Sequence, residues 1–335
     1  MKLTSPSHRR LALVSAVALC TLLACYGSSP APTAQPNLPA PVKWRQTIGS
    51  SVISPPAVVE GRLIFLNEAG NLEARDAATG ALLWTHTLNA SSKRDTPAPV
   101  DSGLAFCVEE TDAYSRMVAI DTATGQSRWQ MTLTAASGTY ITGAPGAAAG
   151  RVYAESAMDP NPHTLRAADV ATGSLRWETG LNRDWLVTAP AVADGFVVIG
   201  VRRSVSQTAA PQVASGNQDL VRAFDAATGQ ARWEYPLPSY FSTGLTAAAG
   251  RVYAGTHDGQ VVALDLGTGA AWTFTGSGPA QTAAVDQDRV YFGDQGGTVH
   301  ALRVGDGSVA WEYPAGTSIT SPASVSGGRV YIDKG

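Results

Sequence analysis

The sequence predicts an all-β protein, a β-propeller of four-stranded antiparallel blades, and three observations support this prediction. Apolar or alternating runs of strand length, such as residues 251–254 and 261–264, are bounded by Gly, Asp and Asn. Tryptophans recur at nearly constant spacing behind a shared turn motif, and no helical period competes with the strand pattern. The 294 residues from Val42 to the end accommodate seven repeats of 42, a length typical of propeller blades.

The turn motif reads Asp-x-x-Thr-Gly, and a Trp follows the Gly by four residues. Four copies keep every spacing, while the copy at 265–269 reaches its Trp one residue early and the copy at 303–307 has its acid displaced. Asp and Thr side chains can bond the amides of such a turn, and Gly can adopt the positive φ that a Cβ disfavours. We expect each Trp to lie on the outermost strand and to pack against the next blade. The structural repeat residues are Trp44, Trp84, Trp129, Trp177, Trp233, Trp272 and Trp311, with Gly80, Gly125, Gly173, Gly229 and Gly269.

A second unit, Gly-Arg-Val-Tyr or a close variant, recurs between the tryptophans and brings the count to seven. A propeller must close, because an open ring exposes unpaired strand edges. Trp44 would supply an outer strand for the last blade, and residues 320–326 and 329–332 would supply its first two strands. Its third strand is missing from the sequence. Either the seventh blade is incomplete, or the chain is a truncated form of a longer protein with eight blades.

The N-terminal residues predict export. Basic residues precede a thirteen-residue apolar run from Leu11 to Leu23, which is too short to cross a bilayer and reads as a secretory signal. The run ends in Leu-Leu-Ala-Cys, which resembles a bacterial lipobox and makes Cys25 a candidate for lipidation. An ordinary secretory signal, with Cys25 incidental, is the alternative. We therefore expect a signal peptide at 1–24, a Pro/Ser/Ala-rich tether at 25–41 and the propeller domain at 42–335.

The amino-acid composition limits the classes of partner and of chemical site that this protein can have. Charged residues make up only 15% of the chain, and acidic residues outnumber basic ones by 27 to 24, a balance that argues against nucleic acid as a partner. Cys107 is the single cysteine of the propeller part and lies in an apolar strand, so we expect a packed thiol and no intramolecular disulfide. The five histidines lack the spacing of a metal site.

The longer motif Ala-x-Asp-x-x-Thr-Gly-x-x-x-Trp, complete from Ala74, Ala119, Ala167 and Ala223, resembles the quinoprotein-type propeller repeat. That family includes PQQ-dependent alcohol dehydrogenases, BamB-type lipoproteins of outer-membrane β-barrel assembly, and binding proteins without a cofactor. The resemblance implies that a PQQ enzyme would also carry adjacent cysteines over the quinone, a catalytic Asp and calcium ligands. The chain has no adjacent cysteines. We therefore expect a non-catalytic protein with no cofactor and no metal.

If the repeat itself has no catalytic role, the function should lie in the segments that differ from one blade to the next. The connections between second and third strands lengthen in three consecutive blades, at 109–115, 155–164 and 202–219, and aromatic residues enter the neighbouring connections on the same face. Aromatic and Arg side chains are favoured at protein interfaces. Asp159 and Glu155 would lie at the edge of this predicted surface. The alternative is that the aromatic rings merely fill the mouth of the central channel. The predicted partner-binding residues are Tyr140, Trp185, Tyr240, Phe241, Arg183, Arg202 and Arg203.

These observations favour an exported, membrane-anchored scaffold that binds protein partners. The resemblance to BamB-type lipoproteins implies a part in outer-membrane β-barrel protein assembly. Two alternatives stay open. One is a degenerate PQQ-dependent dehydrogenase or small-ligand-binding propeller that uses the axial channel. The other is a cell-envelope adhesion or sensor module.

Overall fold

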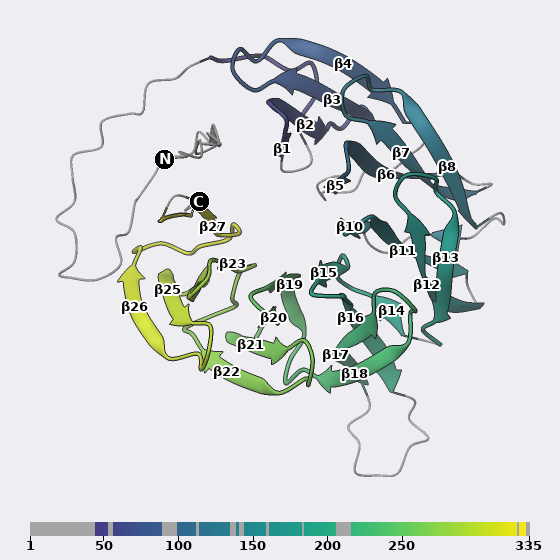
Figure 1. Ribbon diagram of the computed structural model, residues 1–335. Coiled ribbons are helices and arrows are strands. Elements are labelled where there is room, and N and C mark those ends of the chain that lie inside the picture. The colour runs from purple at the N-terminus through teal and green to yellow at the C-terminus, as the bar shows by residue number, and fades with distance from the viewer. Residues whose placement is uncertain are drawn as a thin grey trace, which may run out of the picture.

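The computed structural model shows seven antiparallel sheets arranged in a ring, each with its first strand nearest the axis (Figure 1). It describes residues 44–52, 56–88, 99–111, 114–134, 139–140, 144–158, 161–182, 184–205, 216–326 and 328–332. Within these residues every regular element is a strand. The predicted all-β propeller is therefore confirmed, with seven blades, of which the last is two-stranded in the described part.

The first three blades follow one strand order, with consecutive strands paired from the axis outward. Blade 1 contains β1 (Ala57–Val59), β2 (Arg62–Leu66), β3 (Asn71–Asp76) and β4 (Leu82–Thr87). Blade 2 contains β5 (Val100–Asp101), β6 (Leu104–Glu110), β7 (Ser115–Asp121) and β8 (Ser127–Thr134). Blade 3 contains β10 (Gly146–Ala148), β11 (Arg151–Met158), β12 (Asn161–Asp169) and β13 (Leu175–Gly180), with β9 (Thr139–Tyr140) paired to β11.

The remaining blades keep this order, although blade 4 divides its inner strand in two. Blade 4 contains β14 (Trp185–Leu186) and β15 (Ala191–Ala193), both paired to β16 (Phe196–Val205), then β17 (Gly216–Asp225) and β18 (Ala231–Pro236). Blade 5 contains β19 (Phe241–Ala248), β20 (Arg251–Thr256), β21 (Gln260–Asp265) and β22 (Ala271–Thr275). Blade 6 contains β23 (Ala284–Val285), β24 (Arg289–Gly293), β25 (Thr298–Arg303) and β26 (Val309–Pro314), and blade 7 contains β27 (Ser324–Ser326) and β28 (Arg329–Tyr331).

The recurring Gly-Arg unit forms the hairpin turn between the first and second strands of a blade. In blade 3 both turn residues, Ala149 and Gly150, have positive φ, at 54° and 74°. Two successive left-handed residues form the type I′ turn, whose twist matches that of the strands it joins. The same pair of left-handed residues occurs in blades 1 to 5 and fixes their register at the inner edge.

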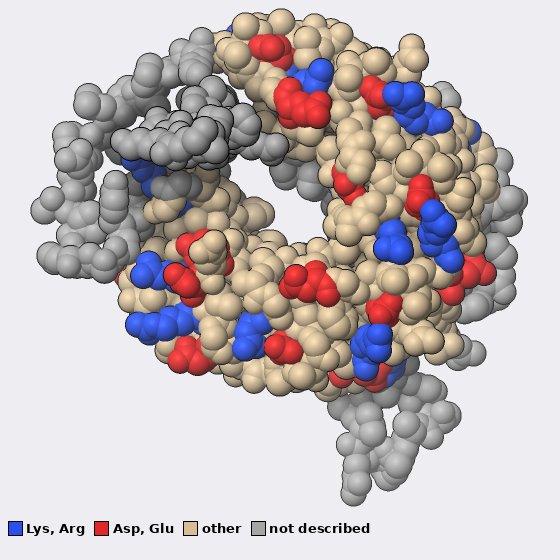
Figure 2. All heavy atoms as spheres, viewed as in Figure 1, with Lys and Arg blue, Asp and Glu red and all other residues tan. Residues whose placement is uncertain are grey.

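The core lies between blades. One apolar cluster joins Phe106 and Met117 of blade 2 to Val152 and Ala168 of blade 3, and similar clusters join every other pair of consecutive blades from 1 to 7. Small residues such as Ala147 and Ala191 dominate the innermost strands, and the space-filling view shows an opening at the centre of the ring (Figure 2). Packing is therefore concentrated at the seams, where each sheet covers the next.

The tryptophans occupy these seams as predicted. Trp129 donates its indole N–H to the Val170 carbonyl of the next blade at 2.8 Å. The same bond links Trp44 to Ala77, Trp84 to Thr122, Trp177 to Ala226, Trp233 to Leu266 and Trp272 to Val304, at 2.8–3.2 Å. Trp311 differs: its buried Nε1 has no partner among the described residues. The described part of blade 7 contains only β27 and β28, so it includes no turn between third and fourth strands that could offer the carbonyl.

One predicted element differs in detail. Residues 44–48 do not form a strand, although Trp44 takes its expected place against blade 1. A strand needs a neighbour for its ladder, and the third strand of blade 7 is not among the described residues. The indole contact, rather than sheet pairing, fixes this segment to the ring. The predicted signal peptide, Cys25 and the tether all lie outside the described residues.

Candidate partner-binding face

One face of the ring carries the connections from second to third strands and from each blade to the next. In blade 1 the two kinds of connection touch, because the Leu88 amide donates to the Gly70 carbonyl at 3.0 Å. The opposite face carries the two other kinds of turn, which are joined where Ala77 donates to Gly61 at 2.8 Å. Among the hairpins that join second and third strands, β6–β7, β11–β12 and β16–β17 have the longest strands. The docking rim is defined here by described residues on these hairpins and beside them: Glu109, Tyr114, Arg116, Glu155, His163, Asp184, Arg202, Arg203, Asp219 and Tyr240.

In blade 4 the rim presents an arginine and a tyrosine over a buried carboxylate. Arg202 and Asp219 are directly opposite each other in the ladder of β16 and β17, and Asp219 accepts two bonds from the guanidinium at 2.6 and 2.9 Å. The Asp219 side chain is fully buried and also accepts the Phe241 amide at 2.8 Å. The Arg202 guanidinium lies 4.6 Å from the ring centroid of Tyr240, which is 45% exposed. Bonding to Asp219 raises the pKa of Arg202, so its charge is permanent.

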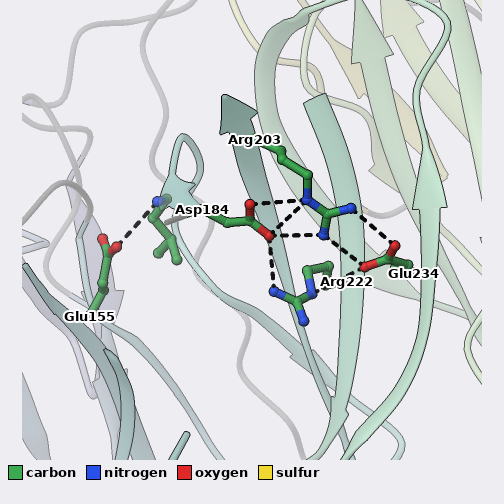
Figure 3. A network of polar contacts seen from close by, with 6 residues as sticks. Glu155, Asp184, Arg203, Arg222 and Glu234 are labelled. Atoms are coloured by element: carbon green, nitrogen blue, oxygen red, sulfur yellow. Dashed lines mark hydrogen bonds and ion pairs between the residues drawn. The ribbon is translucent and has the colours of Figure 1, made fainter. Parts of the chain in front are cut away.

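A second network braces the same blade (Figure 3). Asp184, just before β14, accepts from Arg203 at 2.9 Å and from Arg222 at 3.2 Å. Arg203 also reaches Glu234 on β18 at 3.0 Å, which lowers the pKa of Glu234. Two carboxylates and two guanidiniums thus tie the inner connection, the long hairpin and the outer strand together. A connected network of this kind restrains side chains more than isolated surface pairs do.

Blade 3 is joined to blade 4 by Glu155. This buried carboxylate approaches His163 Nδ1 at 2.6 Å and accepts the Leu186 amide of β14 at 3.2 Å. Figure 3 shows the second contact beside the Asp184 network. The Glu155 side chain therefore joins the β11–β12 hairpin to β14 of blade 4 below the surface of the rim.

Blade 2 repeats the arrangement seen in blade 4. Arg116 and Glu109 are cross-strand partners in β6 and β7, and the Arg116 Nε lies 2.5 Å from the buried Glu109 carboxylate. The guanidinium stacks 4.8 Å from the ring centroid of Tyr114. Two blades thus each present a tyrosine and an arginine, with the arginine fixed from below by a carboxylate.

Comparison with known proteins agrees with this architecture. A family model described as outer membrane protein assembly factor BamB matches residues 40–158 and 163–334. The chain belongs to the BamB family. Its relatives include BamB of Yersinia pestis, 24% identical over 97% of this chain and 86% of that protein. They also include a polyvinylalcohol dehydrogenase of a Pseudomonas species, 23% identical over 82% of this chain.

The chain spans 55% of the length of that dehydrogenase. Among solved structures, BamB of Moraxella catarrhalis superposes with a TM-score of 0.62, at 22% identity, over 87% of this chain and 83% of that one. This similarity shows the shared propeller fold. The dehydrogenase match shows that the same repeat also occurs in enzymes.

The structure of this BamB-family chain brings only part of the predicted site together. Tyr240, Arg202 and Arg203 lie in the rim with the contacts given above. The backbone of Tyr140 pairs with Ala157, and that of Trp185 lies opposite Arg202, but their side chains are outside the described part. Arg183 and Asp159 lie wholly outside it.

Two of the expected rim residues are not at the surface. Phe241 is buried in the core between blades 4 and 5, with its ring packed against Gly200, so it supports Tyr240 from below. Glu155 is buried as well, because its carboxylate serves His163 and the Leu186 amide. Tyr240 lies just before β19 and Phe241 is its first residue, and successive side chains along an extended chain point to opposite sides. Adjacent positions in the sequence therefore did not place both rings on one surface.

The buried acids of the rim were not predicted from the sequence. Asp219, Asp184 and Glu109 lie beneath the arginines, and none was a candidate. A usable signal existed for two of them, since Arg202 with Asp219 and Glu109 with Arg116 are oppositely charged residues at hairpin positions that face each other. Asp184 gave no such signal, because its partners lie on strands distant in sequence.

The residues present do not fit the family's quinone site. Cys107 is buried inside β6, which confirms the expected packed thiol, and this burial raises the pKa of the thiol to about 12. It is the only free cysteine in the described part, so the adjacent-cysteine lid of the dehydrogenases cannot be built there. No cluster of three or more His, Cys, Asp or Glu side chains suited to a metal occurs among the described residues, and none of the described segments forms a helix that could span a membrane.

Proposed function

We propose that this protein is an exported, lipid-anchored scaffold without catalytic activity that binds protein partners through the docking rim and takes part in outer-membrane β-barrel assembly. Membership of the BamB family supports the assembly role, and the lipobox at Cys25 supports the anchor. The observation that carries the proposal is the Arg202–Tyr240 pair above buried Asp219.

The chemistry of this pair suits protein recognition. Tyr and Arg dominate binding energy at interfaces, because each combines a large apolar surface with hydrogen-bond donors. Asp219 engages Nε and Nη2 of Arg202, which leaves Nη1 without a partner among the described residues. Tyr240 is one of the few large, exposed aromatic side chains described. Because both groups are already held in place, little conformational entropy is lost when a partner binds.

The test is photocrosslinking in intact cells of a Gram-negative host that carries this protein. A photoreactive amino acid is placed at Tyr240, and in a matched control at Gln126, an exposed residue of a turn on the opposite face. We expect position 240 to crosslink to subunits of the β-barrel assembly machinery and position 126 not to do so. Equal crosslinking from both positions, or crosslinking to the machinery from 126 alone, would reject the rim as the docking surface.

A paired substitution checks that the contact contributes energy. Tyr240→Ala together with Arg202→Gln should reduce capture of the crosslinked subunit at least tenfold, which corresponds to about 1.4 kcal/mol or more. Arg232→Gln, which alters an exposed arginine on the opposite face, is the control and should leave capture unchanged. Unchanged capture by a folded Tyr240→Ala, Arg202→Gln variant would contradict the proposal.

A further inference from the structure

The turn between the third and fourth strands is built the same way in blades 1 to 5. In blade 3, Asp169 Oδ1 accepts the amides of Ala171 and Thr172 and the Thr172 hydroxyl, each at 3.0 Å. The same three bonds recur at Asp76, Asp121, Asp225 and Asp265. The Thr hydroxyl in turn accepts the amide two residues on, as from Ser174 at 3.3 Å. A carboxylate therefore sits at the centre of each of these five turns.

Blade 6 keeps the backbone of this turn and loses the carboxylate. Arg303 stands where the other blades have Asp, yet its amide and carbonyl make the usual turn bonds, to Ser308 at 2.8 Å and from Gly307 at 2.9 Å. Asp306 stands where the others have Thr and takes over the role of Thr, because it accepts the Ser308 amide at 2.9 Å. In blade 5 the Asp265 carboxylate accepts the amides of Gly267 and Thr268, and among the described residues no side chain of another residue accepts the corresponding amides of Gly305 and Asp306. The Asp306 amide interacts with the carboxylate of its own residue.

The presence of Arg303 at the position of the repeat Asp also creates a like-charge pair. Arg289 and Arg303 are direct cross-strand partners in β24 and β25. In blades 1, 3 and 5 the corresponding pairs are Arg62 with Asp76, Arg151 with Asp169, and Arg251 with Asp265. Like charges directly opposite each other are destabilising. Within the described residues neither Arg289 nor Arg303 forms an ion pair with a carboxylate, and Arg303 Nη1 bonds only Ser308 Oγ and the Val309 carbonyl.

These groups line an open pocket of about 490 Å³, formed by Asp288, Arg289, Arg303, Gly305 and Asp306. Arg251 of blade 5 holds the turn from outside by donating to the Gly305 carbonyl at 3.2 Å. We propose that this pocket binds a small oxyanion, a carboxylate or a phosphate, in the place that the repeat reserves for an Asp side chain. The oxyanion accepts the Gly305 and Asp306 amides and separates the Arg289 and Arg303 guanidiniums.

The pocket has a charge pattern that limits its ligand. The negative charges of Asp288 and Asp306 offset the positive charges of the two arginines, so a large polyanion gains little electrostatic attraction there. A single anionic group in contact with both guanidiniums can still accept their directional hydrogen bonds. The pocket lies on the face opposite the docking rim, because it is built from the turn between third and fourth strands. It therefore does not depend on the function proposed for the rim.

Arg303→Asp is the decisive variant, because it restores the carboxylate of the repeat from within the chain. For the wild-type protein we expect succinate or inorganic phosphate to raise the Tm by about 2–4 °C at roughly ten times its dissociation constant, relative to NaCl of equal ionic strength. Arg303→Asp should have a higher Tm without ligand and show no ligand-dependent shift. Arg289→Gln should lose the shift and gain less Tm than Arg303→Asp, because it relieves the like-charge pair without supplying the carboxylate. Arg232→Gln, on blade 4, should keep the shift.

Isothermal titration calorimetry with the same two anions identifies the ligand class. A heat of binding with succinate alone would identify a carboxylate site, and one with phosphate alone a phosphate site. Binding of both anions would identify a general oxyanion site. In each case Arg303→Asp must abolish the heat of binding. The proposal is overturned if neither anion binds the wild-type protein more than chloride does. It is equally overturned if Arg303→Asp and Arg289→Gln, both folded, bind with unchanged affinity.

Discussion

The indole ring of Trp129 lies flat against Gly173 of the next blade, so close that a Cβ on the glycine would come within 2.6 Å of the ring. Gly173 also has a φ of 70°. One residue thus serves two needs, a left-handed turn and a flat surface for the neighbouring indole. The same relationship joins Trp84 to Gly125, Trp177 to Gly229 and Trp272 to Gly307.

Gly173→Ala should destabilise the protein by about 2–5 kcal/mol, because it adds a left-handed alanine and a steric clash with Trp129. Gly150→Ala is the matched control, since Gly150 has a φ of 74° but nothing within 4 Å of the added Cβ. That change should cost only about 1–2 kcal/mol. Urea denaturation measures both values, and equal losses would show that the indole contact contributes nothing beyond the backbone term.

Trp129→Phe and Trp311→Phe should differ in cost. The first removes the hydrogen bond to the Val170 carbonyl and leaves that acceptor unpaired, whereas Trp311 has no such bond among the described residues. Both variants lose similar ring volume. We expect Trp129→Phe to be more destabilising by about 1 kcal/mol, a difference that thermal unfolding of the two variants can measure. A larger loss for Trp311→Phe would contradict the view that its N–H is unpaired.

Asp219→Asn should lower the free energy of unfolding by about 1–3 kcal/mol, because the buried carboxylate accepts Arg202 and the Phe241 amide. Glu178→Gln is the control. Its side chain is largely exposed in the ion pair with Arg166, and such pairs contribute about 0–1 kcal/mol. Chemical denaturation of both variants at neutral pH makes the comparison, and a loss at Asp219 no larger than at Glu178 would show that the rim does not need its buried acid.

Acid should weaken the turns of the repeat. Hydrogen bonds from Arg176 and Thr172 lower the pKa of Asp169 from 3.8 to about 2, and Asp225 behaves alike through Arg232 and Thr228. A carboxyl whose pKa is lower in the folded state stabilises the fold above its ordinary pKa, and this contribution is lost as the pH falls toward the folded pKa. The Tm difference between wild type and Asp169→Asn should therefore be constant at neutral pH and shrink between about pH 4 and pH 2. A difference that does not change over this range would rule out the lowered pKa.

The sequence allowed the ring, the blade number and the seams to be predicted, because those features depend on local patterns that repeat. A motif such as the one from Asp169 to Trp177 contains its own turn bonds and its own packing residue. The rim depended on contacts between distant segments, such as Asp184 with Arg222, and no local pattern encodes these. The burial of Phe241 could not be predicted either, because the sequence does not give the register of β19 with β20, which determines which side chains of β19 face the core.

In blades 1 to 6 the outer strand carries an indole that contacts the next blade, and the turn before that strand carries a glycine that contacts the indole of the preceding segment. Neighbouring blades therefore do not need side chains that are complementary to one particular partner blade. A duplicated stretch of the gene would encode a unit already compatible with both of its neighbours, and the loops above it could then diverge without disturbing the joint. Lineages of this fold can in this way change ring size and surface independently.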